Sequence, residues 1–135
     1  MNEIERIHEE AQKILDQKKQ EVTPTELSIL LQSQYFNIEE MFTFASNYKE
    51  ENIDNHILIA ERIQKLCNSY SNNLKLFPSL LSWENRKYQN ERVVSIQGEI
   101  NKSLELLNAV KRNNEVGSLG TMMELNEVMR KHNIK

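Results

Sequence analysis

The sequence predicts an all-α protein, a small bundle of about five or six helices, and three observations support this fold class. Only 3 of the 135 residues are glycine and 2 are proline, so few residues interrupt a helix. Apolar side chains recur at spacings of three and four residues along much of the chain. No stretch keeps the two-residue alternation that is typical of a half-buried strand.

Length and composition narrow the class further. A chain of 135 residues, with 39% hydrophobic and 27% charged residues, is sufficient for a single soluble helical domain over residues 1–135. No apolar run approaches the roughly 20 residues of a membrane span, and the charged start of the chain is unlike a signal peptide. Cys67 is the only cysteine and has no partner for an internal disulfide. We therefore expect a cytoplasmic protein without membrane insertion.

The first element is an N-terminal amphipathic helix over residues 1–20. Its apolar residues Ile4, Ile7, Ala11 and Ile14 follow a 3-4-3 spacing, which is typical of a coiled-coil seam. A stripe of four residues is too short to stabilise an isolated helix. The seam therefore predicts a partner surface, and a homodimer is one arrangement that would provide it.

Two helix starts are predicted between residues 23 and 48. Thr23, Pro24 and Glu26 form the pattern of a capping box with proline in the first turn. Asn37 and Glu40 repeat the capping pattern. We therefore expect a turn just before Asn37 and two helices that pack as a hairpin in the core.

The same segment has the rhythm of a DNA-binding helix-turn-helix. A helix that reads DNA meets a lattice of phosphates and needs lysine or arginine. The second helix would instead carry Glu39 and Glu40, with no basic residue before Lys49. The core hairpin is therefore the favoured interpretation.

The next two helices follow a loop and a break. Asp54 is expected to cap a helix that ends near Tyr70, and Pro78 must interrupt or begin a helix. The longest helix is predicted from about residue 79 to 113 and is coiled-coil-like. Its apolar stripe consists of Val93, Ile96, Ile100, Leu104 and Leu107.

A hinge and a short tail helix complete the chain. Gly117 lies in a predicted hinge over residues 114–121, and a second glycine follows in the same hinge. Thr121 is expected to cap a C-terminal helix over residues 122–133. Its methionines give it a small, adaptable apolar face that suits either a partner groove or docking back onto the bundle.

The residues that could carry out chemistry do not form a recognisable constellation. Near the N-terminus, the helical zinc motif fails because Gln12 stands where a second histidine is needed. Glu5 and His8 form one Glu-x-x-His pair, but a carboxylate-bridged metal site needs two. Cys67 lies on an apolar helix face, and residues 117–120 lack the lysine of a phosphate-binding loop. We therefore predict no metal, no cofactor and no enzymatic activity, unless a polar pocket unites Cys67 with His56 and an acid.

Trp83, the only tryptophan, stands in the polar stretch LLSWENRKYQNERVV at residues 80–94. Tyr88 points in a different direction from Trp83 on a helix, which argues against a stacking platform for single-stranded nucleic acid. Trp83 is expected either to pack against another helix or, as the second choice, to anchor a protein partner. The candidate partner-binding residues are Trp83 with Arg86, Lys87, Asn90 and Val94 on the same helix side, and Met122, Leu125 and Met129 of the tail helix.

Charge is distributed unevenly along the chain. Residues 22–60 hold six acids and one base, whereas residues 61–135 hold eight acids and twelve bases. The predicted function is a non-enzymatic protein-binding module, such as an adaptor, a secretion-type chaperone or an inhibitor, that docks a protein partner through helical surfaces. The alternative is a nucleic-acid-associated regulatory protein, whose bases would have to converge on one surface. Those bases are Arg86, Lys87, Lys102, Lys111, Arg112, Arg130 and Lys131.

Overall fold

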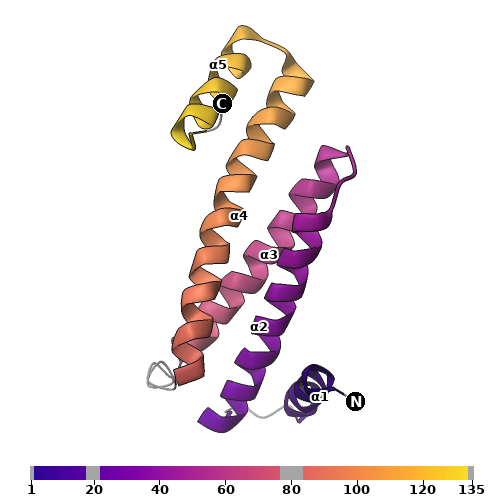
Figure 1. Cartoon of the computed structure of the whole chain (residues 1–135), viewed down its shortest axis with the longest axis vertical. Helices are drawn as coiled ribbons and strands as arrows, with labels where there is room; N and C mark the ends of the chain where they lie inside the picture. The colour runs from indigo at the N-terminus through magenta and orange to yellow at the C-terminus, as the bar shows by residue number, and fades with distance from the viewer. Residues whose placement is uncertain (1, 18–21, 77–83, 134–135) are drawn as a thin grey trace.

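The computed structural model describes residues 2–17, 22–76 and 84–133. Within these residues the fold consists of five α-helices without any strand, and this confirms the predicted all-α class. Figure 1 shows the order of the elements. The helices are α1 (Glu3–Asp16), α2 (Pro24–Asn47), α3 (Ile53–Leu74), α4 (Glu84–Val116) and α5 (Leu119–Lys131).

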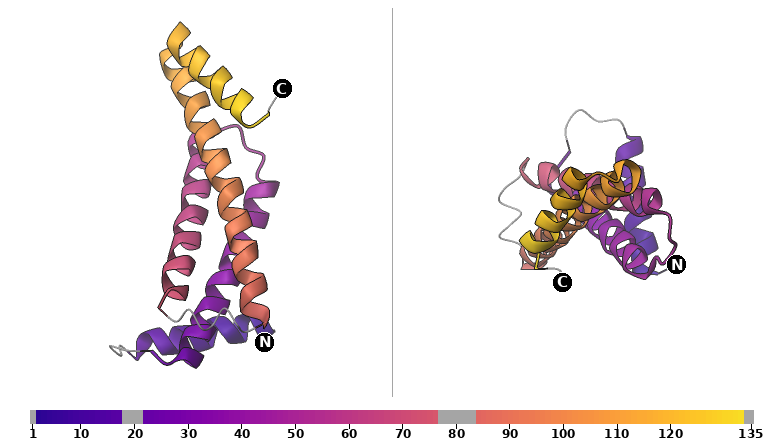
Figure 2. Two further views of the ribbon diagram at one scale, coloured as in Figure 1. Left: turned by 90° about the vertical axis from the view of Figure 1, so that its left-hand side faces the viewer. Right: turned by 90° about the horizontal axis from the view of Figure 1, so that it is seen from above.

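Three long helices form the body of the molecule. Helices α2, α3 and α4 run along its long axis, and α3 packs against both of the others. The shorter α1 lies across one end of α2, and α5 folds back along the C-terminal part of α4 (Figures 1 and 2). The two short helices therefore sit at opposite ends of the elongated body.

The core lies between α2, α3 and α4. Leu31, Ile63 and Val93, one from each helix, are fully buried. The apolar stripe predicted for the longest helix faces this core, which explains why that helix remains regular over 33 residues. The buried cluster consists of Leu27, Leu31, Ile38, Ile57, Ala60, Ile63, Cys67, Tyr70, Leu74, Val93, Ile96, Ile100 and Leu104.

Helix α2 contradicts the predicted hairpin. It is one continuous helix through Asn37, whose side chain is exposed and caps nothing in the structure. The predicted capping box at Thr23 and Glu26 is present, with both reciprocal hydrogen bonds at 3.1 Å. Buried Ile38 continues the packing of α2 across the expected turn. Neither glycine nor proline interrupts α2 after its first residue, so tertiary packing outweighs the local capping preference of Asn37.

The boundaries of α3 and α4 differ slightly from the expected ones. Asn52, rather than Asp54, caps α3, because its side-chain oxygen accepts a hydrogen bond from the Asp54 amide at 3.0 Å. Helix α4 continues to Val116, three residues beyond the predicted end. The predicted start near residue 79 falls in 77–83, outside the described residues.

The predicted hinge is shorter than eight residues. Only Gly117 and Ser118 separate α4 from α5. Gly117 has φ of +64°, a left-handed conformation that glycine adopts without strain. Ser118, rather than Thr121, caps α5, because its hydroxyl accepts a hydrogen bond from the Thr121 amide at 3.1 Å.

Three of the four residues of the predicted N-terminal seam are buried within the chain. Ile7, Ala11 and Ile14 face α2 and are at most 9% exposed. His8 supports this contact, since its Nδ1 lies 2.6 Å from the Ser33 hydroxyl oxygen. The partner surface of these three residues is therefore α2, whereas Ile4, the first residue of the predicted seam, is 45% exposed.

Candidate interaction surface

The predicted partner-binding residues on α4 do not share one environment. Lys87 and Val94 are exposed and Asn90 is half-buried, whereas Arg86 is only 4% exposed. Trp83 lies outside the described residues. The structure therefore separates Arg86 from the surface group that helical spacing had suggested.

Arg86 ties the start of α4 to α2. Its Nη2 donates hydrogen bonds to the carbonyl oxygen of Ser28 at 3.1 Å and to the Ser28 hydroxyl at 3.0 Å. Its Nη1 donates to the side-chain oxygen of Gln89, which is also buried. A planar guanidinium with several donors suits such a buried position better than an ammonium group does. Sequence spacing missed this role because Ser28 is 58 residues away.

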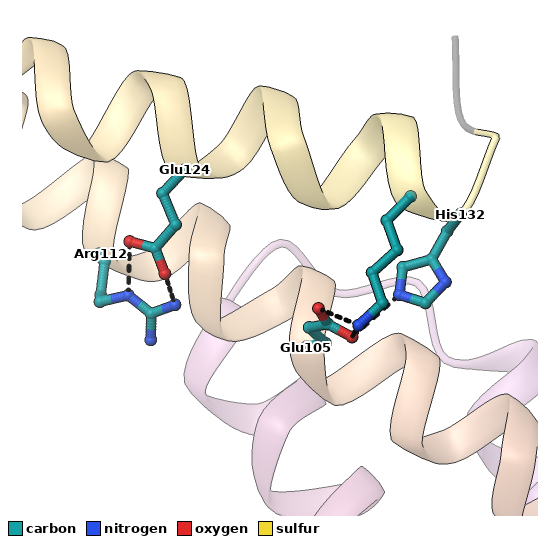
Figure 3. Close-up of polar contacts among 5 residues, drawn as sticks. Glu105, Arg112, Glu124 and His132 are labelled. Carbon is teal, nitrogen blue, oxygen red and sulfur yellow. Dashed lines mark hydrogen bonds and ion pairs between the residues drawn. The ribbon is translucent and has the colours of Figure 1, made fainter.

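Helix α5 forms several polar contacts with α4. Arg112 Nε donates to Glu124 at 3.2 Å, and Lys131 donates to Glu105 at 3.0 Å. His132 Nε2 lies 3.0 Å from the same Glu105 carboxylate (Figure 3). Lys131 first, and then His132, hold the pKa of Glu105 below its ordinary value. We call Glu105, Arg112, Glu124, Lys131 and His132 the clasp.

Apolar side chains of α5 are covered only in part. Val128 is the one residue of α5 that is buried, and Ala109 of α4 is buried outside the main core cluster. The clasp residues are partly exposed to solvent, where water and salt screen an ion pair so that it contributes little to stability. The attachment of α5 is therefore weak compared with the packing of the three long helices.

An apolar patch surrounds the turn between α4 and α5. Among the described residues, eleven large apolar side chains are exposed, and four of them fall within residues 116–123. Within residues 2–17, 22–76 and 84–133 this is the densest run of exposed apolar side chains in the sequence, so the patch is the candidate interaction surface. We call it the tip patch, and it consists of Val116 (64% exposed), Leu119 (72%), Met122 (50%) and Met123 (62%).

The tip patch matches the sequence prediction only in part. Met122 belongs to it, whereas the predicted residues Leu125 and Met129 are half-buried on α5. Val116 and Leu119 were assigned to the hinge and were missed as binding candidates. Their position on both sides of Gly117 could have indicated that they are exposed. Apolar residues next to a tight turn between helices have little neighbouring surface to cover them.

Many basic side chains of the C-terminal half already have acidic partners. Lys111 Nζ lies 2.8 Å from Asp54, and Arg130 lies 2.6 Å from Glu127. Two further bases belong to the clasp, and Arg86 is buried. These five side chains therefore do not converge on an open basic surface.

A small pocket of about 250 Å³ opens where α2, α3 and α4 meet. Tyr48 and His56 line this pocket. The Tyr48 hydroxyl donates a hydrogen bond to the Glu50 carboxylate at 3.0 Å. The His56 Nε2 is hydrogen-bonded to the backbone carbonyl of Glu50. Cys67 is not among the lining residues and is fully buried elsewhere on α3. The pocket therefore does not unite His56 with Cys67. Its lining is Ala45, Tyr48, His56, Ile59, Ala60, Ile100, Ser103, Leu106 and Leu107.

Cys67 is expected to be unreactive in the folded protein. Burial raises the pKa of its thiol from 9.0 to about 11, so the nucleophilic thiolate is scarce at neutral pH. We expect iodoacetamide to label native protein at pH 8 at least tenfold more slowly than urea-unfolded protein. Because the folded state holds this proton more tightly, its contribution to stability should decline as pH rises from about 9 to 11. Equal labelling rates in the native and unfolded states would contradict this burial.

Two further features bear on the class of protein. Within the described ranges, no cluster of three His, Cys, Asp or Glu side chains could hold a metal ion. None of the described helices combines the length and the apolar character needed to cross a membrane. The fold and its surface thus define a small all-α bundle with an apolar tip. No protein-family model, curated protein or solved structure matches the chain.

Proposed function

We propose that the chain is a non-enzymatic protein-binding module, of the adaptor, chaperone or inhibitor type, that contacts its partner through the tip patch. The observation that carries this proposal is the concentration of four exposed apolar side chains around the α4–α5 turn. Methionine supplies two of the four, and its flexible thioether adapts to apolar surfaces of different shape. A cytoplasmic location, expected from the lone cysteine, is part of the proposal.

The structure offers less support for nucleic-acid binding. Phosphate binding relies on cationic side chains that are free to replace counterions. Lys111, Arg112, Arg130 and Lys131 are each within 4 Å of an acidic side chain. The guanidinium of Arg86 is directed to Ser28 and Gln89 inside the molecule. A protein partner is therefore the function that the surface favours.

The proposal is tested by placing charge in the tip patch. The double variant Met122→Lys/Met123→Lys should keep the fold, since both side chains are about half exposed or more. It should lose at least about 2 kcal/mol of partner affinity if these residues are central to the interface. Capture from source lysate, followed by quantitative mass spectrometry, should show a partner retained by the wild-type protein and lost by the variant.

A matched control separates the tip patch from general apolar exposure. Leu15 is a residue of α1 and is 61% exposed. Helix α1 lies at the other end of the molecule from α5 (Figure 1). Leu15→Lys should capture the same partner as the wild-type protein. If the tip variant retains every captured protein, or if Leu15→Lys loses the same ones, the tip patch is not the interface.

A further inference from the structure

Helix α5 forms its interhelical polar contacts with a single helix. In the described structure, each hydrogen bond or ion pair from α5 and its C-cap to another helix ends on α4. Val128 of α5 is buried, as is Ala109 on the part of α4 between the two ends of the clasp. This face of α4 thus provides all of the interhelical polar contacts that α5 makes among the described residues, and it can be regarded as a docking site for α5.

The connection to that helix is short and conformationally restricted. Gly117 keeps φ at +64° and donates its amide to the Asn113 carbonyl at 2.8 Å. Ser118 then starts α5 directly. A two-residue hinge of this kind closes the helix pair tightly, and exchange of an identical terminal element between copies is a low-cost route to a dimer.

We propose that the docking site on α4 also accepts α5 of a second copy of this chain. Each copy would place its α5 on α4 of the other, so that Arg112 of one copy bonds Glu124 of the other. The same contacts hold the helix in both forms, and only the hinge changes conformation. The inference rests on the α4–α5 contacts and goes beyond the proposed binding of another protein.

The tip patch supports this exchanged dimer independently. Val116 and Leu119 stand on the two sides of the hinge and are more than 60% exposed in the single chain. If α5 keeps its register on α4, the hinges of both copies lie side by side at the two-fold axis. The two tip patches then meet, and apolar surface that is exposed in the monomer becomes covered. The exchanged dimer and another protein partner would therefore compete for the tip patch.

Complementary charge exchange tests the proposal directly. Arg112→Glu places two carboxylates together at the clasp within one chain, and Glu124→Arg places two guanidinium groups together. When the two variants are mixed, an exchanged mixed dimer restores an opposite-charge pair at both interfaces. Native mass spectrometry should show the mixed dimer enriched at least about tenfold over either homodimer, given the modest strength of exposed ion pairs.

The readout distinguishes exchange from other association. Copies that associate through the tip patches alone, with α5 still on its own α4, would form mixed dimers and homodimers in statistical proportion. That result, or a mixture that stays monomeric at every concentration, would overturn the proposal. Neither result bears on capture of another protein by the tip patch, so failure of this inference and failure of the proposed function are distinguishable.

A glycine substitution gives a second test. Gly117→Ala strains the closed hinge, because an alanine rarely adopts a positive φ. The strain is absent from the open hinge, so formation of one exchanged dimer removes it from two chains. We expect the dimer dissociation constant to fall by about 30-fold or more. Gly98→Ala is the matched control, since Gly98 lies within α4 with open space around it, and its dissociation constant should stay unchanged. Sedimentation that shows a monomeric Gly117→Ala variant over the wild-type concentration range would contradict the exchange.

Discussion

Replacing Tyr70 by alanine is expected to destabilise the protein by about 3–5 kcal/mol, the range for truncating a large buried aromatic side chain. Tyr70 is the largest fully buried side chain among the described residues and belongs to the cluster between α2, α3 and α4. Its removal leaves a cavity that the three helices cannot close without shifting. Because native stability is typically about 5–15 kcal/mol in total, the loss should be evident in urea unfolding.

Tyr70→Phe is the matched control. The Tyr70 hydroxyl is buried beside the Arg86 guanidinium and forms no hydrogen bond of standard geometry. Burial raises the pKa of this hydroxyl, and the nearby Arg86 guanidinium offsets part of that effect. Because this polar contact has poor geometry, removing the hydroxyl should change stability by no more than about 1 kcal/mol. A loss with phenylalanine comparable to the loss with alanine would show that the hydroxyl, rather than the ring, supports the core.

The parts of the fold that follow from helical spacing were predictable. The apolar stripe from Val93 to Leu104 predicted that one face of the long helix is buried. The structure places these residues in the core. The 3-4-3 spacing of α1 likewise predicted burial, although the choice between α2 and a second copy was open. Periodicity therefore identifies a buried face, but it does not identify which helix covers that face.

Local end signals were less reliable than periodicity. Asn37 and Glu40 have the residue types of a helix start, yet they lie in the middle of α2. A capping pattern stabilises a helix end by only about 1 kcal/mol. The continuous burial of α2 against α3 exceeds that contribution, and the chain remains helical. At Thr23 the same kind of pattern is followed by a real helix start, because Pro24 cannot continue a preceding helix.

The interaction surface was harder to predict because it depends on contacts between distant segments. The exposure of Val116 and Leu119 follows from the sharp turn at Gly117, whose positive φ the sequence alone does not specify. The burial of Arg86 depends on the Ser28 carbonyl, which α2 brings to the start of α4. Helical spacing placed Arg86 beside Lys87, but it could not show that the guanidinium has buried acceptors.

Arg86→Ala is expected to destabilise the protein by about 2–4 kcal/mol, in contrast to the surface role that the sequence suggested. The substitution leaves the Ser28 carbonyl and the buried Gln89 without the donors that Arg86 supplies. It also removes a long side chain that fills space between α2 and α4. Arg86→Lys should recover only part of this loss, because a single ammonium group cannot reproduce the planar set of donors.

Lys87→Ala is the control that separates a structural from a surface role. Lys87 is the next residue on α4, but its side chain is exposed. Its truncation should change the free energy of unfolding by no more than about 0.5 kcal/mol. Urea unfolding of both variants gives the comparison. If Arg86→Ala unfolds at the wild-type midpoint and loses only partner capture, then Arg86 acts at an interface. If only Arg86→Ala lowers the urea midpoint strongly, then Arg86 stabilises the contact between α2 and α4. The tip patch then remains the proposed surface for partners.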